Sequence, residues 1–67
     1  MIEIQINGER RELAEGTTLA ELLKALELSS RPIAVELNRR VVPRGEHGAT
    51  MLKPLDALEI VTLVGGG

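Results

Sequence analysis

Residues 2–8 read IEIQING, and this stretch decides the fold. Its three isoleucines alternate with a glutamate and a glutamine, which is the period-two pattern of a strand with one buried face. Asn7 and Gly8 follow directly, and this dipeptide favours a two-residue type I′ turn because both central positions need a positive φ. We therefore predict a hairpin whose returning strand covers residues 10–13, with charges suited to the edge of a sheet.

A helix is predicted to begin at Leu19. Thr18 and Glu21 have the capping-box spacing, in which the two side chains satisfy amides left free at a helix start. Four leucines then recur at the i, i+3, i+4 and i+7 positions of one apolar stripe: Leu19, Leu22, Leu23 and Leu26. In so small a domain little else could cover a sheet, so we interpret the stripe as core rather than as a partner-binding face.

Three more strands are expected after the helix. Residues 33–37 alternate apolar and polar side chains and predict a third strand. Residues 38–40 can turn into a short fourth strand over residues 41–43, which Pro43 confines to a strand end or edge. Residues 45–50 read as a loop or helical turn and residues 55–57 as a turn. The final strand is predicted to start at Leu58.

This order of elements predicts an α+β fold with one main helix on one face of a mixed sheet of four to five strands. A helical connection between the hairpin and the later strands lets the last strand lie parallel to the first at the sheet centre. That arrangement is a β-grasp. We expect residues 1–64 to form the domain and residues 65–67 to form a flexible, reactive glycine tail.

The Gly65-Gly66-Gly67 ending can lie extended and enter a channel that any side chain would block. A terminal carboxylate, with a pKa of roughly 3.5, is ionised and reacts only when a partner activates it. If Leu58 and Ile60 face the helix, Val61 and Leu63 lie on the opposite face beside the tail and form a docking surface. The alternative for the glycine tail is a frayed chain end without function, and the alternative for the two apolar side chains is exposure without a role in binding.

Size and composition exclude several classes of function. A chain of 67 residues builds one domain, which buries only about 60% of the surface of its unfolded chain, so a deep active site is not expected. The chain has no cysteine, and therefore no disulfide or thiolate site. A net charge of −2 without any aromatic residue disfavours nucleic-acid binding. Without a long apolar run or a signal peptide, we expect a cytoplasmic protein that does not enter membranes.

Two polar features are interpreted as structural. His47 is the only histidine, and without a second ligand or a nearby nucleophile it does not predict a metal or catalytic site. Arg39, Arg40 and Arg44 form the densest basic cluster. We interpret the cluster as a solvated turn, since exposed charges are the default there.

At this point the chain resembles the ubiquitin-like sulfur carriers of the thiamine pathway, the ThiS family, along essentially its whole length. The stretches that carry the resemblance are residues 4–9, 16–23, 35–38, 41–44 and 58–67. The glycine ending is common among ubiquitin-like proteins, whereas Val-Val-Pro-Arg at residues 41–44 and the short length are more specific. Two departures concern turn and packing detail: Leu55-Asp56 replaces the usual Gly-Asp, and the region of His47 lacks the tryptophan that relatives often carry.

The resemblance implies a mechanism. An E1-like adenylating enzyme of the ThiF type would use ATP and magnesium to turn the Gly67 carboxylate into an acyl-adenylate. A sulfur donor would replace AMP, and the thiocarboxylate would deliver sulfur to a thiazole synthase of the ThiG type. Gly65 and Gly66 would thread into the partner while Val61 and Leu63 dock the body. The chain would bind no cofactor itself and would be a protein cosubstrate, not an enzyme, monomeric when free.

The sequence is also compatible with other functions. The small subunit of molybdopterin synthase shares the chemistry but is typically longer and contains aromatic residues. A modifier conjugated to lysines is a related possibility. A β-grasp interaction module with an inert tail belongs to a different class. An enzyme has the least support, because the sequence offers no acid–base pair, nucleophile or metal set.

Overall fold

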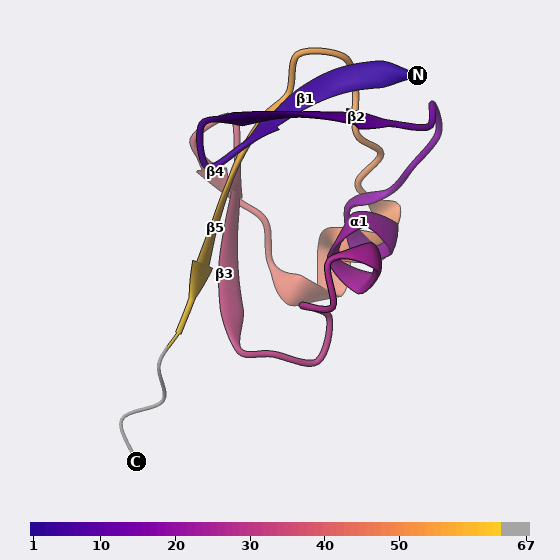
Figure 1. The fold of residues 1–67 in the computed structure, drawn as a ribbon. Coiled ribbons are helices and arrows are strands. Elements are labelled where there is room, and N and C mark those ends of the chain that lie inside the picture. Colours follow the sequence, from indigo (N-terminus) through magenta and orange to yellow (C-terminus); the bar gives the residue numbers. More distant parts are fainter. Residues whose placement is uncertain (64–67) are drawn as a thin grey trace.

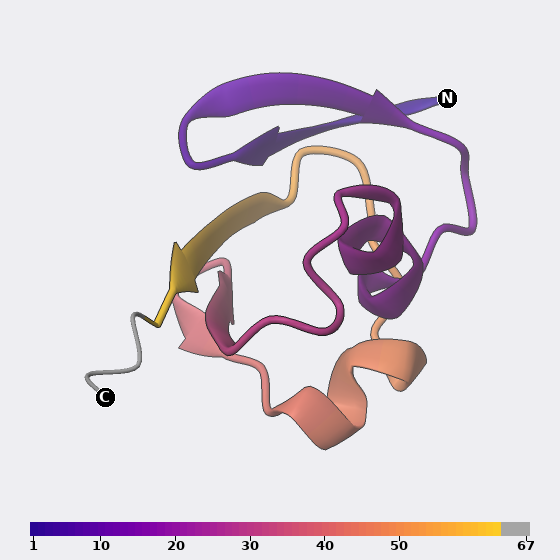
Figure 2. The same ribbon diagram turned by 60° about the horizontal axis from the view of Figure 1, so that its bottom comes forward.

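The computed structural model of the protein describes residues 1–63 (Figure 1). The elements follow in the order β1 (Ile2–Ile6), β2 (Glu9–Leu13), α1 (Leu19–Ala25), β3 (Ile33–Leu37), β4 (Arg40–Val41), the 3₁₀ helix η1 (Arg44–Ala49) and β5 (Ala57–Thr62). The five strands form one sheet in the order β2-β1-β5-β3-β4. β5 is central, parallel to β1 and antiparallel to β3, and α1 and η1 lie together beside the sheet (Figure 2). The predicted α+β fold with a mixed sheet is confirmed.

The N-terminal hairpin forms as predicted. Asn7 and Gly8 have φ values of 50° and 85°, so both turn residues lie in the left-handed region that a type I′ turn requires. The turn sets the antiparallel register that pairs Ile6 with Glu9 and continues to the far end of both strands. β2 starts one residue earlier than expected, and it is an edge strand.

The capping box is also confirmed at the start of α1. The Thr18 hydroxyl accepts from the backbone N–H of Glu21 at 3.2 Å, and the Glu21 carboxylate accepts from the N–H of Thr18 at 2.9 Å. The bond from the Thr18 backbone, followed by the bond from its hydroxyl, lowers the pKa of Glu21 below its usual value. The helix ends at Ala25, so Leu26 is its C-cap and is only partly buried.

The core lies between the sheet and the two helical segments. All three isoleucines of β1, three leucines of α1 and the inner residues of β3 and β5 contribute to it, together with Leu52: the buried set is Ile2, Ile4, Ile6, Leu19, Leu22, Leu23, Val35, Leu52, Leu58 and Ile60. Leu52 belongs to no predicted element. Its N–H donates to the Thr17 carbonyl at 3.0 Å, which ties the segment after η1 to the start of α1.

The fourth strand is shorter and earlier than predicted. Asn38 and Arg39 both have positive φ and form a two-residue turn, so pairing with β3 resumes at Arg40, opposite Leu37. Pro43 is the N-cap of η1 instead of a strand residue. The turn before β5 is likewise centred earlier, and Ala57 is already in the strand. Val64, which the prediction assigned to the domain, lies outside the described residues.

Leu55 occupies a backbone conformation that its side chain disfavours. Its φ is 68°, and its side chain is 80% exposed. The Leu55 N–H donates to the Glu3 carbonyl at 2.7 Å, and the Asp56 carboxylate accepts from the N–H of Lys53 at 2.8 Å, so the turn is fixed from both sides. A left-handed residue other than glycine costs about 1–2 kcal/mol. A glycine at this position would adopt the same conformation without that cost.

We expect Leu55→Gly to raise the free energy of unfolding by roughly 0.5–1 kcal/mol, because relief of the left-handed strain exceeds the extra entropy of an unfolded glycine. Urea denaturation measures this. Leu55→Ala is the matched control, since it removes the same exposed side chain but keeps Cβ. An equal gain in both variants would show that exposure, and not backbone strain, is the cause.

Candidate functional site

The candidate site is the C-terminal end of β5 and the residues that follow it. β5 extends past the β1–β2 hairpin with β3 alongside it (Figure 1). Gly65, Gly66 and Gly67, the predicted reactive tail, lie outside the described residues. The structure therefore defines the strand that leads to the tail and the surface around it.

The side chain of Asn7 holds the far end of β5. Its Oδ1 accepts from the Ile60 N–H at 2.9 Å, and its Nδ2 donates to the Ile60 carbonyl at 3.1 Å. These bonds continue the β1–β5 ladder, whose backbone pairing joins Ile6 to Leu58. A carboxamide carries one acceptor and two donors and so can pair like a peptide group. Asn7 thus takes the place of a further strand residue.

Asn38 secures the other end of β5 in a similar way. Its Oδ1 accepts from the Ala57 N–H at 3.0 Å, and its Nδ2 donates to the Asp56 carboxylate at 3.0 Å. On the β3 side, the Leu63 N–H donates to the Pro32 carbonyl at 2.8 Å. The side chains of two left-handed turns therefore hold β5 at Ala57 and Ile60, and the backbone bond to Pro32, just before β3, holds the chain at Leu63. The sequence pattern predicts both asparagines only as turn residues and does not reveal these side-chain bonds.

Val61 and Leu63 face away from the core, as predicted. They are 57% and 50% exposed, whereas their neighbours Leu58 and Ile60 are buried. Ala34 of β3 lies opposite Val61 in the antiparallel register and is also exposed. We call the exposed side chains of Ala34, Val61 and Leu63 the apolar patch. Its predicted role in docking a partner stays a prediction.

A pair of glutamates borders the apolar patch. Glu36 of β3 and Glu59 of β5 are direct cross-strand partners, and like charges in that position repel each other. Arg39 lines the same surface hollow as Glu59. Within residues 1–63 the ion pair present lies elsewhere, between Arg10 and Glu3 at 3.8 Å, and both side chains are exposed. The border of the patch is therefore polar and acidic.

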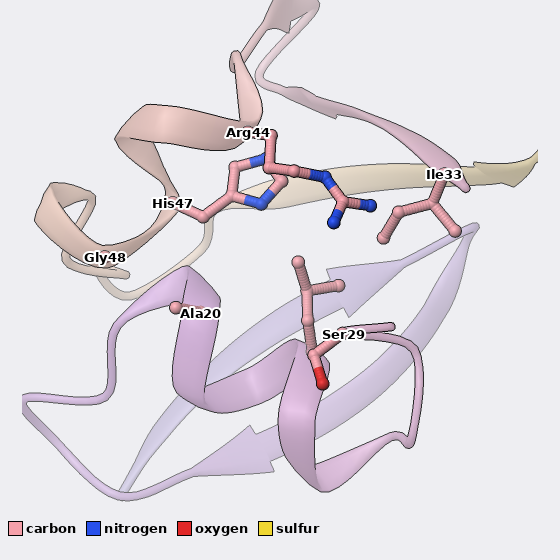
Figure 3. Close-up of a pocket in the computed structure, with 7 residues that line it drawn as sticks. Ala20, Ser29, Ile33, Arg44, His47 and Gly48 are labelled. Carbon is pink, nitrogen blue, oxygen red and sulfur yellow. The ribbon is translucent and has the colours of Figure 1, made fainter. Parts of the chain in front are cut away.

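His47 is buried and lines a cavity of about 180 Å³ between α1, η1 and β3 (Figure 3). Its Nε2 is 3.0 Å from the Val42 carbonyl, which can only accept, so Nε2 carries the proton in this bond. Ile33 and Ser29 also line the cavity, and the guanidinium of Arg44 points toward Ile33 in Figure 3. The bond explains the buried histidine in structural terms, as the sequence interpretation held.

The basic cluster separates into two parts. Arg39 and Arg40 are exposed at the turn into β4, which agrees with the prediction. Arg44 begins η1, and its Nη2 donates to the Arg31 carbonyl at 2.8 Å, so it connects η1 to the loop before β3.

Residues 1–63 contain neither a group of three or more potential metal ligands nor a helix long and apolar enough to cross a membrane.

Comparisons with known proteins give a consistent result over nearly the whole chain. The model of the ThiS family matches residues 4–67. The sulfur carrier protein ThiS of Bacillus subtilis is 31% identical over 65 residues, which cover 96% of this chain and 98% of that protein. The crystal structure of the thiamine biosynthesis protein ThiS of Geobacter metallireducens is 35% identical, with a TM-score of 0.84 and coverage of 98% and 100%. This likeness confirms the ubiquitin-like β-grasp.

A longer relative is also similar. A thiazole synthase of Magnetococcus marinus is 42% identical over 66 residues, which cover 98% of this chain. The chain spans only about one fifth of that relative, since the match covers 20% of its length.

Asn7→Gly should isolate the side-chain bonds to Ile60, because glycine keeps the positive φ of the turn. We expect a loss of roughly 1–3 kcal/mol in the free energy of unfolding, the range for two hydrogen bonds. Amide exchange at Ile60 should also accelerate, as NMR would show. Asn7→Asp is the control: it keeps the acceptor but places an oxygen against the Ile60 carbonyl. If Asn7→Asp matched the wild type, the bond donated by Nδ2 would have no role.

Proposed function

The chain belongs to the ThiS family, and we propose that it is a sulfur carrier of thiamine biosynthesis whose Gly67 carboxylate is converted to a thiocarboxylate. The end-to-end match to the Bacillus subtilis sulfur carrier carries this proposal. The sequence adds a chemical reason: the chain has no cysteine, so it cannot hold sulfur as a persulfide of its own. In this proposal Gly67 ends the chain and is the attachment point.

The carboxylate of Gly67 needs a leaving group before sulfur can replace an oxygen. An E1-like partner of the ThiF type would join a carboxylate oxygen to the α-phosphate of ATP, with magnesium, and release pyrophosphate. Attack by sulfide, released by a sulfur donor, on the acyl carbon would then form the C–S bond and expel AMP, which leaves a thiocarboxylate on Gly67. ATP and magnesium belong to the activating partner in this scheme, and the chain is its protein cosubstrate.

A thiazole synthase of the ThiG type is the proposed acceptor of the sulfur. Two relatives named thiazole synthase, 42% and 38% identical to this chain, each match it over about one fifth of their own length. A stretch similar to the carrier is thus part of the same polypeptide as a synthase in those organisms. Such a connection supports a working contact between the two proteins.

The domain formed by the described residues would contact the partner and direct the tail into the partner's active site. The apolar patch includes Leu63, the last described residue of the chain, and Asn7 bonds the same strand at Ile60. Removing apolar area from water favours association, and a fixed strand reduces the ordering that binding requires. Gly65 and Gly66 would pass through the narrow part of the partner site.

The intact mass of the carrier tests the proposal after incubation with ATP, a sulfur source and a ThiF-type enzyme. We expect one oxygen to be replaced by sulfur, in an ATP-dependent reaction that fragmentation maps to Gly67. The mapping matters because Met1 and Met51 are exposed, and methionine sulfoxide has nearly the same mass gain. A carrier lacking Gly67 is the control. A folded carrier whose terminus stays unmodified would contradict the proposal.

The acceptor is tested by adding the modified carrier to a ThiG-type thiazole synthase or to the large subunit of molybdopterin synthase. Loss of sulfur only to the first enzyme supports the thiamine assignment. Loss only to the second would replace it with the molybdopterin alternative.

Replacing Gly66 with leucine should prevent activation while leaving the fold intact. Every buried hydrophobic residue of the described chain lies between Ile2 and Ile60, so we expect a change of at most about 2 °C in the melting temperature. Mass spectrometry should detect no thiocarboxylate, because the channel admits little width. Gly66→Ala is the control for size. Full conversion of Gly66→Leu would show that the tail does not thread through a narrow site.

A further inference from the structure

Both outer edges of the sheet are protected against pairing with other chains. β2 has the sequence Glu9-Arg10-Arg11-Glu12-Leu13, whose four charged residues are exposed. β4 is only two residues long, and Pro43 follows it closely. Charged side chains, short length and proline are the usual devices that prevent edge-to-edge association. The sheet therefore ends in two places that do not invite a further strand.

A third, partial edge exists on β5 and lacks this protection. Carbonyl groups at alternate positions, from the residue before β5 onward, face β1: Asp56 accepts from Gln5 at 2.9 Å, and Leu58 accepts from Asn7 at 2.9 Å. Ile60 comes next and is bonded by the Asn7 side chain. Because β1 ends at Ile6, this ladder stops at Ile60 (Figure 1).

Thr62 is the next residue whose peptide groups face this side. In the antiparallel ladder with β3, the bonded positions of β5 are the odd ones, as the Ala57–Asn38 and Leu63–Pro32 bonds show. Peptide groups alternate in direction along a strand, so the Thr62 N–H and C=O point away from β3. Within residues 1–63 neither group has a hydrogen-bond partner. We call this open position the Thr62 edge.

The composition of the Thr62 edge favours pairing. Val61, Thr62 and Leu63 are uncharged, two of them are β-branched, and all three are exposed. Their main chain is held extended by β3 on the other side, so little further ordering is needed to receive a strand. Strand addition uses main-chain bonds for affinity and alternate side chains for specificity. Here the alternate side chains are those of Val61 and Leu63, in the apolar patch.

We propose that a partner protein adds an extended main-chain segment to the Thr62 edge, bonding the N–H and C=O of Thr62 while its side chains cover the apolar patch. The inference rests on the proposed function, since the occupant is the adenylating enzyme that receives the Gly67 carboxylate. Pairing at Thr62 would set the direction in which the chain enters that enzyme.

The size of the edge argues against a second copy of the chain as the occupant. The described part of the edge offers one residue with both peptide groups open, and so small a contact is far from the area that a stable dimer needs. In the proposed complex the tail and the apolar patch also contact the enzyme. Pairing at Thr62 would enlarge that interface, raise its affinity and fix the position of β5 along the enzyme's strand. The partner that holds the tail is thus the favoured occupant.

Thr62→Pro tests the inference, because proline removes the N–H of residue 62 and its ring occupies the space into which that N–H points. A strand edge tolerates proline where the N–H is free, so we expect the variant to fold. Binding to a ThiF-type enzyme is measured by calorimetry against Thr62→Val, which keeps the N–H and loses only the hydroxyl. We expect Thr62→Pro to bind at least about tenfold more weakly than Thr62→Val, the effect of losing one well-formed hydrogen bond. Equal affinities in the two folded variants would overturn the inference.

A second measurement needs no variant. Amide exchange of the wild-type carrier is followed by NMR, free and bound to the enzyme. The Thr62 amide should exchange fast in the free carrier and at least about tenfold more slowly in the complex, as a new main-chain bond requires. Fast exchange at Thr62 in a saturated complex would overturn the inference, even if Thr62→Pro failed to fold.

The outcomes separate the inference from the proposed function. If the wild type acquires sulfur and Thr62→Pro does so with unchanged affinity, the function stands and the edge contact is wrong. If the folded wild type neither binds the enzyme nor acquires sulfur, the function fails, and the named occupant fails with it. Sedimentation of the free carrier tests whether a second copy of the chain occupies the Thr62 edge. A dimer that Thr62→Pro abolishes would make another carrier the occupant and overturn the proposal.

Discussion

The placement of β5 between β1 and β3 is the constraint on which the rest of the structure depends. β5 pairs with a strand from the N-terminal hairpin on one side and a strand that follows the helix on the other. Its inner residues Leu58 and Ile60 are buried against the same core that the helix leucines reach. A central strand loses pairing on both sides if it shifts, so its register is strongly determined. That register also decides which side chains face outward at the end of β5.

Two asparagines hold β5 in this position, although the domain is short. Asn7 and Asn38 each occupy a left-handed turn position, which asparagine tolerates better than most residues. Each also reaches β5 with its carboxamide, so one residue both reverses the chain and anchors the central strand. In a domain too small for a large core, such bonds contribute a considerable share of the specificity of the fold. The two turns are therefore part of the site's construction, although they lie far from it in sequence.

The elements that could be predicted from sequence are those whose cause is local. The Asn7-Gly8 turn and the Thr18–Glu21 capping box need only neighbouring residues, and both formed as expected. The alternation that buries Leu58 and exposes Val61 follows from strand geometry alone.

The features missed from sequence depend on distant contacts. The bond between Asn7 and Ile60 joins residues 53 positions apart. Leu52 is buried in the core and its N–H pairs with the distant Thr17, and no periodicity marks such an isolated core residue. The start of β4 moved because Arg39 adopts a positive φ, which arginine rarely does. The signal that could have found the asparagine bonds is an asparagine in a left-handed turn directly after a strand that neighbours the final strand.

The difference in length between β1 and β5 lets the core and the proposed recognition surface share one strand without conflict. Up to Ile60, both edges of β5 are bonded within the domain, and its inner side chains are in the core. Beyond Ile60, β3 alone holds the strand, and its apolar side chains are exposed next to the cross-strand glutamates Glu36 and Glu59. Exposed apolar area and opposed like charges both lower the stability of the free domain. These unfavourable features lie together at the end of one strand, outside the core, so the rest of the domain stays stable. The exposed apolar side chains and the open peptide groups of Thr62 lie where a partner would cover them.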